Sequence, residues 1–250
     1  MASLGRRQHG VVTRDQMRHL GLSEDEIDGW VRAGRIHRVV RGVYALGHAE
    51  IGERGRIQAA ALACGPGAVV SHRSAAFLLG IGERSPRVVD VISPSQRGRS
   101  IDGIRVHYAP YPARHELVQI RGITCTNVAR TIVDLAGTYG EQDLNETFER
   151  AATEGVLDLA AIDAILASGS RRRGAPCLRR VMEEWRPVAE TANFTDARSL
   201  FEVKLLPLIA AARLPVPRIN AAVRTAERTD RKSTRLNSSH PSKSRMPSSA

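Results

Sequence analysis

Five basic side chains between residues 32 and 41 have the types and spacing to bind nucleic-acid phosphates. They are Arg32, Arg35, His37, Arg38 and Arg41. A guanidinium donates paired hydrogen bonds to phosphate oxygens and to guanine, and each phosphate contact adds a salt-dependent part to the affinity. The alternative is a solvated basic segment in an arginine-rich chain. The elements that surround the cluster favour DNA contact.

Two capping boxes, Thr13 with Gln16 and Ser23 with Glu26, predict two short helices directly before the cluster. The joining sequence Gly21-Leu22 is typical of the tight turn in a helix-turn-helix. Three apolar residues recur at helical spacing in the second helix, so we expect them to pack in the core: Ile27, Trp30 and Val31.

A β-hairpin is predicted after the second helix. Residues 35–40 and 43–45 are rich in β-branched and aromatic side chains, and Arg41-Gly42 is a turn sequence between them. Two short helices followed by a basic hairpin are typical of a winged helix-turn-helix. We predict this domain at residues 5–47, with its second helix in the major groove and the hairpin wing against phosphates.

Residues 52–190 are expected to form a middle domain of mixed α/β structure, so the predicted fold class is α+β. Strands are predicted at 68–70, 87–92, 103–108 and 122–126. Helices are predicted at 56–64, 129–137, 144–154, 159–166 and 176–185, and a further helix is predicted to begin at residue 71. Ser71-His72 opens one of these helices. We expect Ser71 to be its N-cap, because no acidic residue is spaced to complete a Ser/His catalytic site.

The composition points to a basic cytoplasmic protein. The formal net charge is +11, and only three of the 37 basic residues are lysines. The cysteines, Cys64, Cys125 and Cys177, are too scattered for a disulfide framework or a zinc site, and we expect them to be reduced. The histidines show no metal-ligand spacing. No apolar run reaches the length of a transmembrane helix or a signal sequence, so no membrane partner is expected.

Residues 230–250 resemble a translated sequencing-library adapter. The segments that carry this resemblance are DRKSTRLNSSH at 230–240 and SRMPSSA at 244–250. A disordered tail rich in Ser, Lys and Arg is the alternative. We expect an artefactual, disordered tail, which excludes these residues from the fold and implies a longer natural protein that is truncated here.

Segments over most of residues 5–224 resemble one known family. It comprises actinobacterial proteins with an AbiEi-type antitoxin domain at the N-terminus and a Vsr-like endonuclease domain at the C-terminus. The matching segments are RQHGVVTRDQMRHLGLSEDEIDGWVRAGRIHRVVRGVYALGH, ALACGPGAVVSHRSAAFLLGI, GITCTNVARTIVDLA, RRRGAPCLRRV and ARSLFEVKLLPLIAAARLPVPRINAAVR. Asn127-Val128 departs from relatives, which carry a small residue and Pro there; we expect only the start of a helix to change.

The resemblance implies a DNA-binding antitoxin of a type IV toxin-antitoxin system, which represses its own operon through the winged helix. Its partners would be double-stranded operator DNA and a cognate toxin. The resemblance also implies that residues 194–224 are the start of a PD-(D/E)xK nuclease domain, with Glu202 as a catalytic remnant. The family's further Asp and Glu-x-Asp would follow Arg224, where the adapter-like sequence stands instead.

Three hypotheses follow. The first is a transcriptional regulator that needs no cofactor. The second is a Mg²⁺-dependent endonuclease, inactive in this chain because one Glu cannot hold the cations that phosphodiester cleavage needs. The third is a fragment without function. A last helix is predicted at about 196–212, and its apolar residues would stay exposed: Leu205, Leu208 and Ile209.

Overall fold

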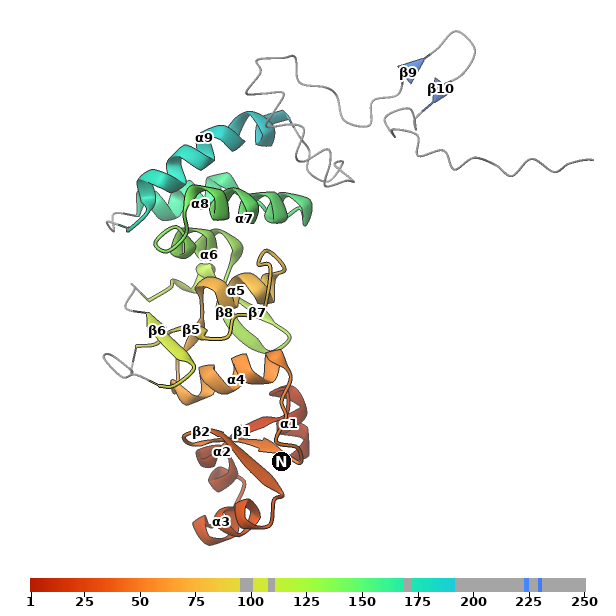
Figure 1. The fold of residues 1–250 in the computed structure, drawn as a ribbon, viewed down its shortest axis with the longest axis vertical. Helices are drawn as coiled ribbons and strands as arrows, with labels where there is room; N and C mark the ends of the chain where they lie inside the picture. Colours follow the sequence, from red (N-terminus) through yellow and green to blue (C-terminus); the bar gives the residue numbers. More distant parts are fainter. Residues whose placement is uncertain (95–100, 108–110, 169–171, 192–222, 225–228, 231–250) are drawn as a thin grey trace, which may run out of the picture.

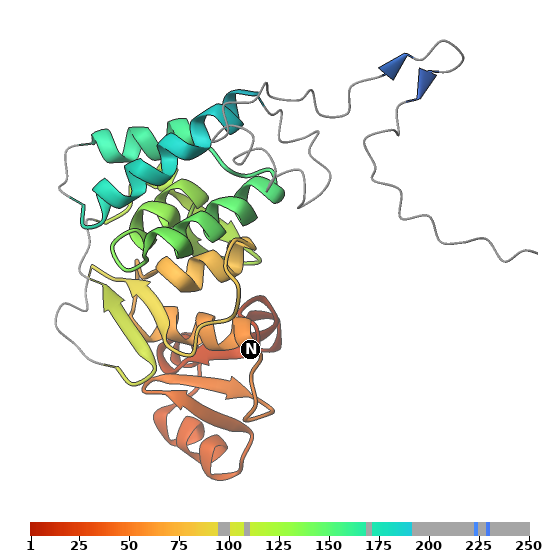
Figure 2. The same ribbon diagram turned by 45° about the horizontal axis from the view of Figure 1, so that its top comes forward.

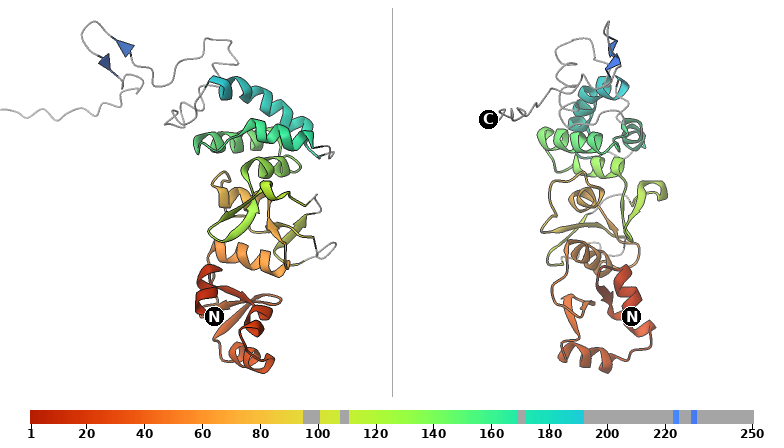
Figure 3. Two further views of the ribbon diagram at one scale, coloured as in Figure 1. Left: turned by 180° about the vertical axis from the view of Figure 1, so that it is seen from behind. Right: turned by 90° about the vertical axis from the view of Figure 1, so that its right-hand side faces the viewer.

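The structure is a computed structural model that describes residues 1–94, 101–107, 111–168, 172–191, 223–224 and 229–230. The elements are stacked along the long axis in chain order. The N-terminal winged helix lies at one end, a five-stranded sheet with its helices in the middle, and a group of helices at the other end (Figure 1; Figure 3, left). The predicted mixed α+β class is therefore confirmed.

The winged helix has three helices and a three-stranded antiparallel sheet of order β1-β3-β2. Its elements are α1 (Ala2–Arg7), β1 (Val11–Thr13), α2 (Arg14–His19), α3 (Glu24–Arg32), β2 (Ile36–Val40) and β3 (Val43–Leu46). Both predicted capping boxes are present, at the starts of α2 and α3. The two helices and the hairpin predicted from the sequence are thus confirmed.

Two elements of this domain were not predicted, α1 and β1, and tertiary contacts explain both. The Cα of Gly5 in α1 lies so close to Leu46 that an added Cβ would overlap the Leu46 side chain. In β1, Val12 pairs with Tyr44 of β3 and faces the helices, whereas Val11 faces the opposite side of the sheet. Neither α1 nor β1 is long enough for its sequence periodicity to reveal it.

The middle sheet has the order β6-β5-β4-β8-β7 and is mixed in direction. Its strands are β4 (Val69–Val70), β5 (Val89–Ile92), β6 (Ile104–His107), β7 (Leu117–Ile120) and β8 (Ile123–Thr126), with a short 3-10 helix η1 (Arg114–Glu116) before β7. Strands β5–β6 and β4–β8 pair in parallel, and the other pairs are antiparallel. The antiparallel strand β7 was not predicted from the sequence.

Helix α4 (Glu53–Ala63) lies between the winged helix and the middle sheet, as Figure 2 shows from a second direction. Ala59 packs with Val11 and Val43 of the winged-helix sheet. Ile57 and Ala60 pack instead with the apolar residues of the middle sheet. The helix is therefore buried on two sides and joins the two units through one continuous apolar contact.

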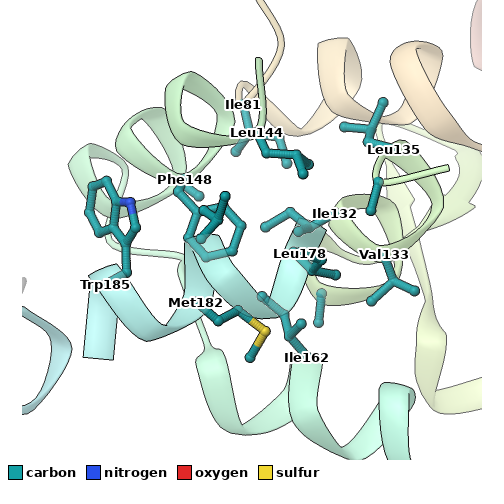
Figure 4. Packing of buried hydrophobic residues seen from close by; sticks show 14 of the residues in the cluster. Ile81, Ile132, Val133, Leu135, Leu144, Phe148, Ile162, Leu178, Met182 and Trp185 are labelled. Atoms are coloured by element: carbon teal, nitrogen blue, oxygen red, sulfur yellow. The ribbon is translucent and has the colours of Figure 1, made fainter. Parts of the chain in front are cut away.

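Five further helices follow in the part of the chain that the structure describes: α5 (His72–Leu79), α6 (Val128–Leu135), α7 (Glu141–Thr153), α8 (Leu159–Ala167) and α9 (Ala175–Thr191). Asn127, the departure from relatives, is the N-cap of α6 and accepts a hydrogen bond from the Arg130 backbone N–H. The last four of these helices enclose an apolar core around Phe148 and Trp185 (Figure 4). The Trp185 indole N–H donates to Asn145 at 2.9 Å.

Two predicted regions lie largely outside the described residues. Of the predicted nuclease remnant at 194–224, only β9 (Val223–Arg224) is described, and of the adapter-like segment only Asp230, which ends β10 (Thr229–Asp230). These two strands pair antiparallel. Across the described ranges, no helix combines the length and the apolarity that crossing a membrane requires.

Candidate nucleic-acid interface

The helix-turn-helix has its own small core. Met17 of α2, Ile27 of α3 and Ile36 of β2 are almost completely buried together with Val12 and Tyr44. Trp30 packs against this cluster, as its spacing predicted. Val31, in contrast, remains 37% exposed, so its predicted place in the core is wrong.

Arg14 connects the three parts of the helix-turn-helix unit. Its backbone N–H donates to Gly42 in the wing turn at 2.9 Å, and its guanidinium donates to the Tyr44 hydroxyl at 3.3 Å. The same guanidinium forms ion pairs with Glu24 and Asp28 on α3. The hydrogen bond to Tyr44 is the largest cause of the raised pKa of Arg14. Arg14 thus fixes α3 relative to the hairpin wing.

Four of the five predicted DNA-facing residues are exposed: Arg32, Arg35, Arg38 and Arg41. Arg32 ends α3, where its Nε donates to the Asp28 carbonyl at 3.4 Å. Arg38 pairs with Tyr44 in the hairpin. Residues paired across two strands share a face of the sheet, so Arg38 lies on the side that faces α2 and α3.

His37 lies on the other face of the sheet from Arg38. It pairs with Ala45, which in turn pairs with Val11, and Val11 packs toward α4. The structure therefore keeps Arg32 and Arg38 on the helix side, with Arg35 just before β2 and Arg41 in the wing turn, and places His37 on the face toward α4. This separation follows from the alternation of side chains along β2.

The first turn of α3 carries three carboxylates, Glu24, Asp25 and Glu26, and Asp28 follows in the next turn. These carboxylates were not part of the predicted DNA-facing cluster. Glu26 is held by Ser23, and the hydrogen bond from the Ser23 backbone is the main cause of its lowered pKa. Arg14 and Arg18 pair with Glu24. Helix α3 is consequently acidic at its start and basic at its end.

The middle unit corrects the expectation for Ser71. This residue is at the N-cap position of α5, but its side chain makes no capping hydrogen bond. Its hydroxyl instead lies 3.0 Å from Nδ1 of His72. The His72 ring stacks on His107 with 3.6 Å between the ring centroids, and His107 Nε2 is 2.7 Å from a carboxylate oxygen of Asp90. The fold thus supplies an acidic neighbour that spacing in the sequence did not reveal.

The predicted catalytic remnant, Glu202, lies outside the described residues. Within the ranges that the structure covers, no three His, Cys, Asp or Glu side chains gather as a metal site would require. Cys64 and Cys125 are buried, and burial raises their pKa values to about 11 and about 12 respectively. Both thiols are therefore protonated at neutral pH and poorly reactive.

Comparison with known proteins gives three findings. No curated protein matches the chain. The crystal structure of the RV2827C protein from Mycobacterium tuberculosis shares 18% sequence identity, covers 72% of this chain and 78% of its own, and has a TM-score of 0.38. The family comparison concerns the N-terminal domain alone: residues 1–47, which fold as the winged helix, match the family described as "Transcriptional regulator, AbiEi antitoxin".

Proposed function

We propose that this protein is a DNA-binding transcriptional regulator of the AbiEi antitoxin kind, which represses its own operon within a type IV toxin-antitoxin system. The observation that carries the proposal is a winged helix whose recognition helix ends beside exposed arginines. The family match of the same residues supports it. The proposal gives the protein two partners, which are double-stranded DNA and a cognate toxin.

The charge distribution along α3 suggests how the domain docks. Carboxylates at the start of the helix repel phosphates, so the end of α3 that carries Arg32 approaches the DNA backbone most closely. Arg38 follows it on the side of the wing that faces the helices, and the exposed Arg35 lies between α3 and β2. A carboxylate in the major groove can still accept a hydrogen bond from the amino group of cytosine. Asp25, which is exposed at the start of α3, is placed for such a contact.

Residues 52–190 are proposed to carry the regulatory or toxin-binding role. They form the larger part of the described structure, and α4 couples them directly to the winged helix. The endonuclease hypothesis depends on Glu202 and on carboxylates beyond Arg224, together with bound Mg²⁺. No described residue favours it over the regulator, so it remains a prediction from the family resemblance.

The test is a salt titration of DNA binding by the full chain and its Arg38→Ala variant. The probes are a duplex from the region upstream of the gene and a shuffled duplex of equal length. We expect the variant to bind more weakly, and its plot of log affinity against log salt to be shallower by about 0.9 for each lost phosphate contact.

Arg180→Ala is the matched control, because Arg180 is an exposed arginine of α9 that pairs with Glu141 far from the wing. It should bind like the wild type. Equal salt slopes for Arg38→Ala and the wild type would remove Arg38 from the interface. A failure of the wild type to bind either duplex at low salt would refute the proposed function.

A further inference from the structure

A cavity of about 470 Å³ lies in the middle unit, on the opposite side of α4 from the winged helix. The segment 82–88, strands β5 and β6, and helices α5 and α7 contribute to its walls. Five arginines from four parts of the chain line it: Arg73, Arg84, Arg87, Arg105 and Arg150. A pocket of this volume matches the size of small-molecule sites in proteins.

The floor of the cavity is rigid and polar. Asp90 is 2% exposed and its carboxylate is bound by His107. Its backbone N–H donates to the Ser74 hydroxyl at 2.9 Å, and its carbonyl accepts from the Ser71 N–H at 3.0 Å. A floor held by these contacts can orient a ligand without rearrangement.

Every carboxylate that lines the cavity already has a partner. Asp90 has His107 and Arg105, Glu83 has Arg84, and Glu146 has Arg150. The fourth, Asp143, accepts a hydrogen bond from the Gly140 N–H at the start of α7. Asp143 keeps its charge, but five arginines and four carboxylates line the cavity, so the lining carries a net positive charge.

Arg73 and Arg87 remain available to an anion. Among the described residues, neither has a carboxylate within salt-bridge distance. Arg73 lies over the Tyr139 ring, 5.1 Å from its centroid. The segment that carries Arg87 is held by Arg56, which donates to the Arg87 carbonyl at 3.0 Å and to the Ser85 hydroxyl at 2.8 Å. The Arg73 guanidinium is thus supported by an aromatic ring, and the backbone that carries Arg87 is held by Arg56; neither contact cancels an arginine charge.

The backbone beside Arg73 supplies an independent observation. His72 has φ = +48°, a left-handed conformation that residues other than glycine adopt rarely. Such strain persists where the surrounding structure holds it and gathers at binding sites. Here the strained residue precedes Arg73 and stacks on the histidine that holds Asp90.

We propose that this cavity binds a small phosphate-bearing molecule of nucleotide size, whose phosphate groups are held by Arg73 and Arg87. Guanidinium groups match the geometry of phosphate oxygens and form charge-assisted hydrogen bonds with them. The Arg73–Tyr139 pair adds a flat surface, and the volume leaves room beyond the phosphates. Two other cavities lack these properties. One between α2 and the 65–68 turn is lined by no arginine. In the other, Arg130 pairs with Glu116 and Asp134, and Arg172 pairs with Asp134.

Calorimetric titration of the full chain with inorganic pyrophosphate and with adenosine 5′-diphosphate tests the proposal. We expect both probes to bind, and the double variant Arg73→Gln, Arg87→Gln to bind each at least about tenfold more weakly. Tighter binding of the diphosphate nucleotide would identify the ligand as a nucleotide. Equal binding of the two probes would identify it as a phosphate anion alone; that outcome keeps the phosphate site and overturns the nucleotide-sized ligand.

Arg180→Gln is the control, since it removes the same charge from an arginine that does not line the cavity. Its affinity for both probes should equal that of the wild type. The proposal is overturned if neither probe binds at millimolar concentration, or if Arg180→Gln loses as much affinity as the double variant. The titration contains no DNA, so its outcome is independent of the proposed regulator function.

Discussion

At the scale of single residues, the middle unit is unusual for the charge it buries. Arg130 has no exposed surface, and it pairs with Glu116 at 3.0 Å and with Asp134 at 2.8 Å. Buried charges persist only where they are paired and hydrogen-bonded. His72 lies in the same polar interior but stays neutral: burial, followed by the nearby charges of His107, Arg130 and Arg105, lowers its pKa to about 3.

This shift makes stability depend on pH. When the pH is above the ordinary histidine pKa, His72 is neutral in both the folded and the unfolded protein. It then contributes nothing to the pH dependence of the free energy of unfolding. As the pH falls below about 6.5, the unfolded chain takes up a proton that the folded protein excludes until about pH 3, so stability decreases across that window. We expect this residue to lower the free energy of unfolding by about 2 kcal/mol between pH 7 and pH 5.

Urea unfolding at a series of pH values measures the effect, with His72→Asn as the variant because Asn tolerates the left-handed backbone that this position requires. The wild type should lose more stability than His72→Asn on acidification. His48→Asn, at an exposed histidine, should behave like the wild type. If the free energy of unfolding falls equally with pH in the wild type and in His72→Asn, His72 is accessible to protons in the folded state.

At the scale of elements, α4 has the most constrained position. A Cβ added at Gly55 would lie 2.8 Å from the carbonyl oxygen of His9 and 3.2 Å from Ile51, and a backbone atom cannot move aside as a side chain can. We expect Gly55→Ala to lower the free energy of unfolding by about 1–3 kcal/mol, the usual effect of overpacking. Chemical denaturation measures it.

Gly29, inside α3, is the matched control because no atom lies within 4 Å of its added Cβ. Gly29→Ala should stabilise the protein by about 0.5–1 kcal/mol through helix propensity. Stabilisation of the chain by both substitutions would contradict the close contact between α4 and the His9 carbonyl.

The sequence predicted those elements whose signals are local. Capping side chains marked the starts of α2 and α3, and hydrophobic periodicity placed the later helices near their observed bounds. The strands β1 and β7 were not predicted, because each is defined by pairing with its partner strand, β3 or β8, rather than by its own sequence pattern.

The candidate sites also differ in whether the sequence alone could reveal them. The arginines of the wing could be found from the sequence because they are neighbours along the chain. The separation of His37 from Arg38 needed the register of the hairpin. The arginine-lined cavity could not be found, since Arg73, Arg87 and Arg150 meet only through the packing of α5 and α7.

At the scale of the whole molecule, the winged helix and the middle unit share apolar contacts through one helix. Val40 and Ala63 contact both the cluster that faces the winged helix and the cluster of the middle sheet. We therefore expect the two units to unfold together. Differential scanning calorimetry of the full chain should show one transition for them, with equal calorimetric and van 't Hoff enthalpies. Two separable transitions would contradict this coupling.

A helix buried on both sides also limits the recombination of domains between such proteins. A recombination event that joined residues 1–47 to a new partner would leave α4 behind and strip the cover from Val11 and Val43. One that carried α4 along would expose Ile57 and Ala60 to water. A viable chimera must therefore supply a surface that α4 can pack on, so the winged helix and the remainder of the chain are constrained to be inherited together.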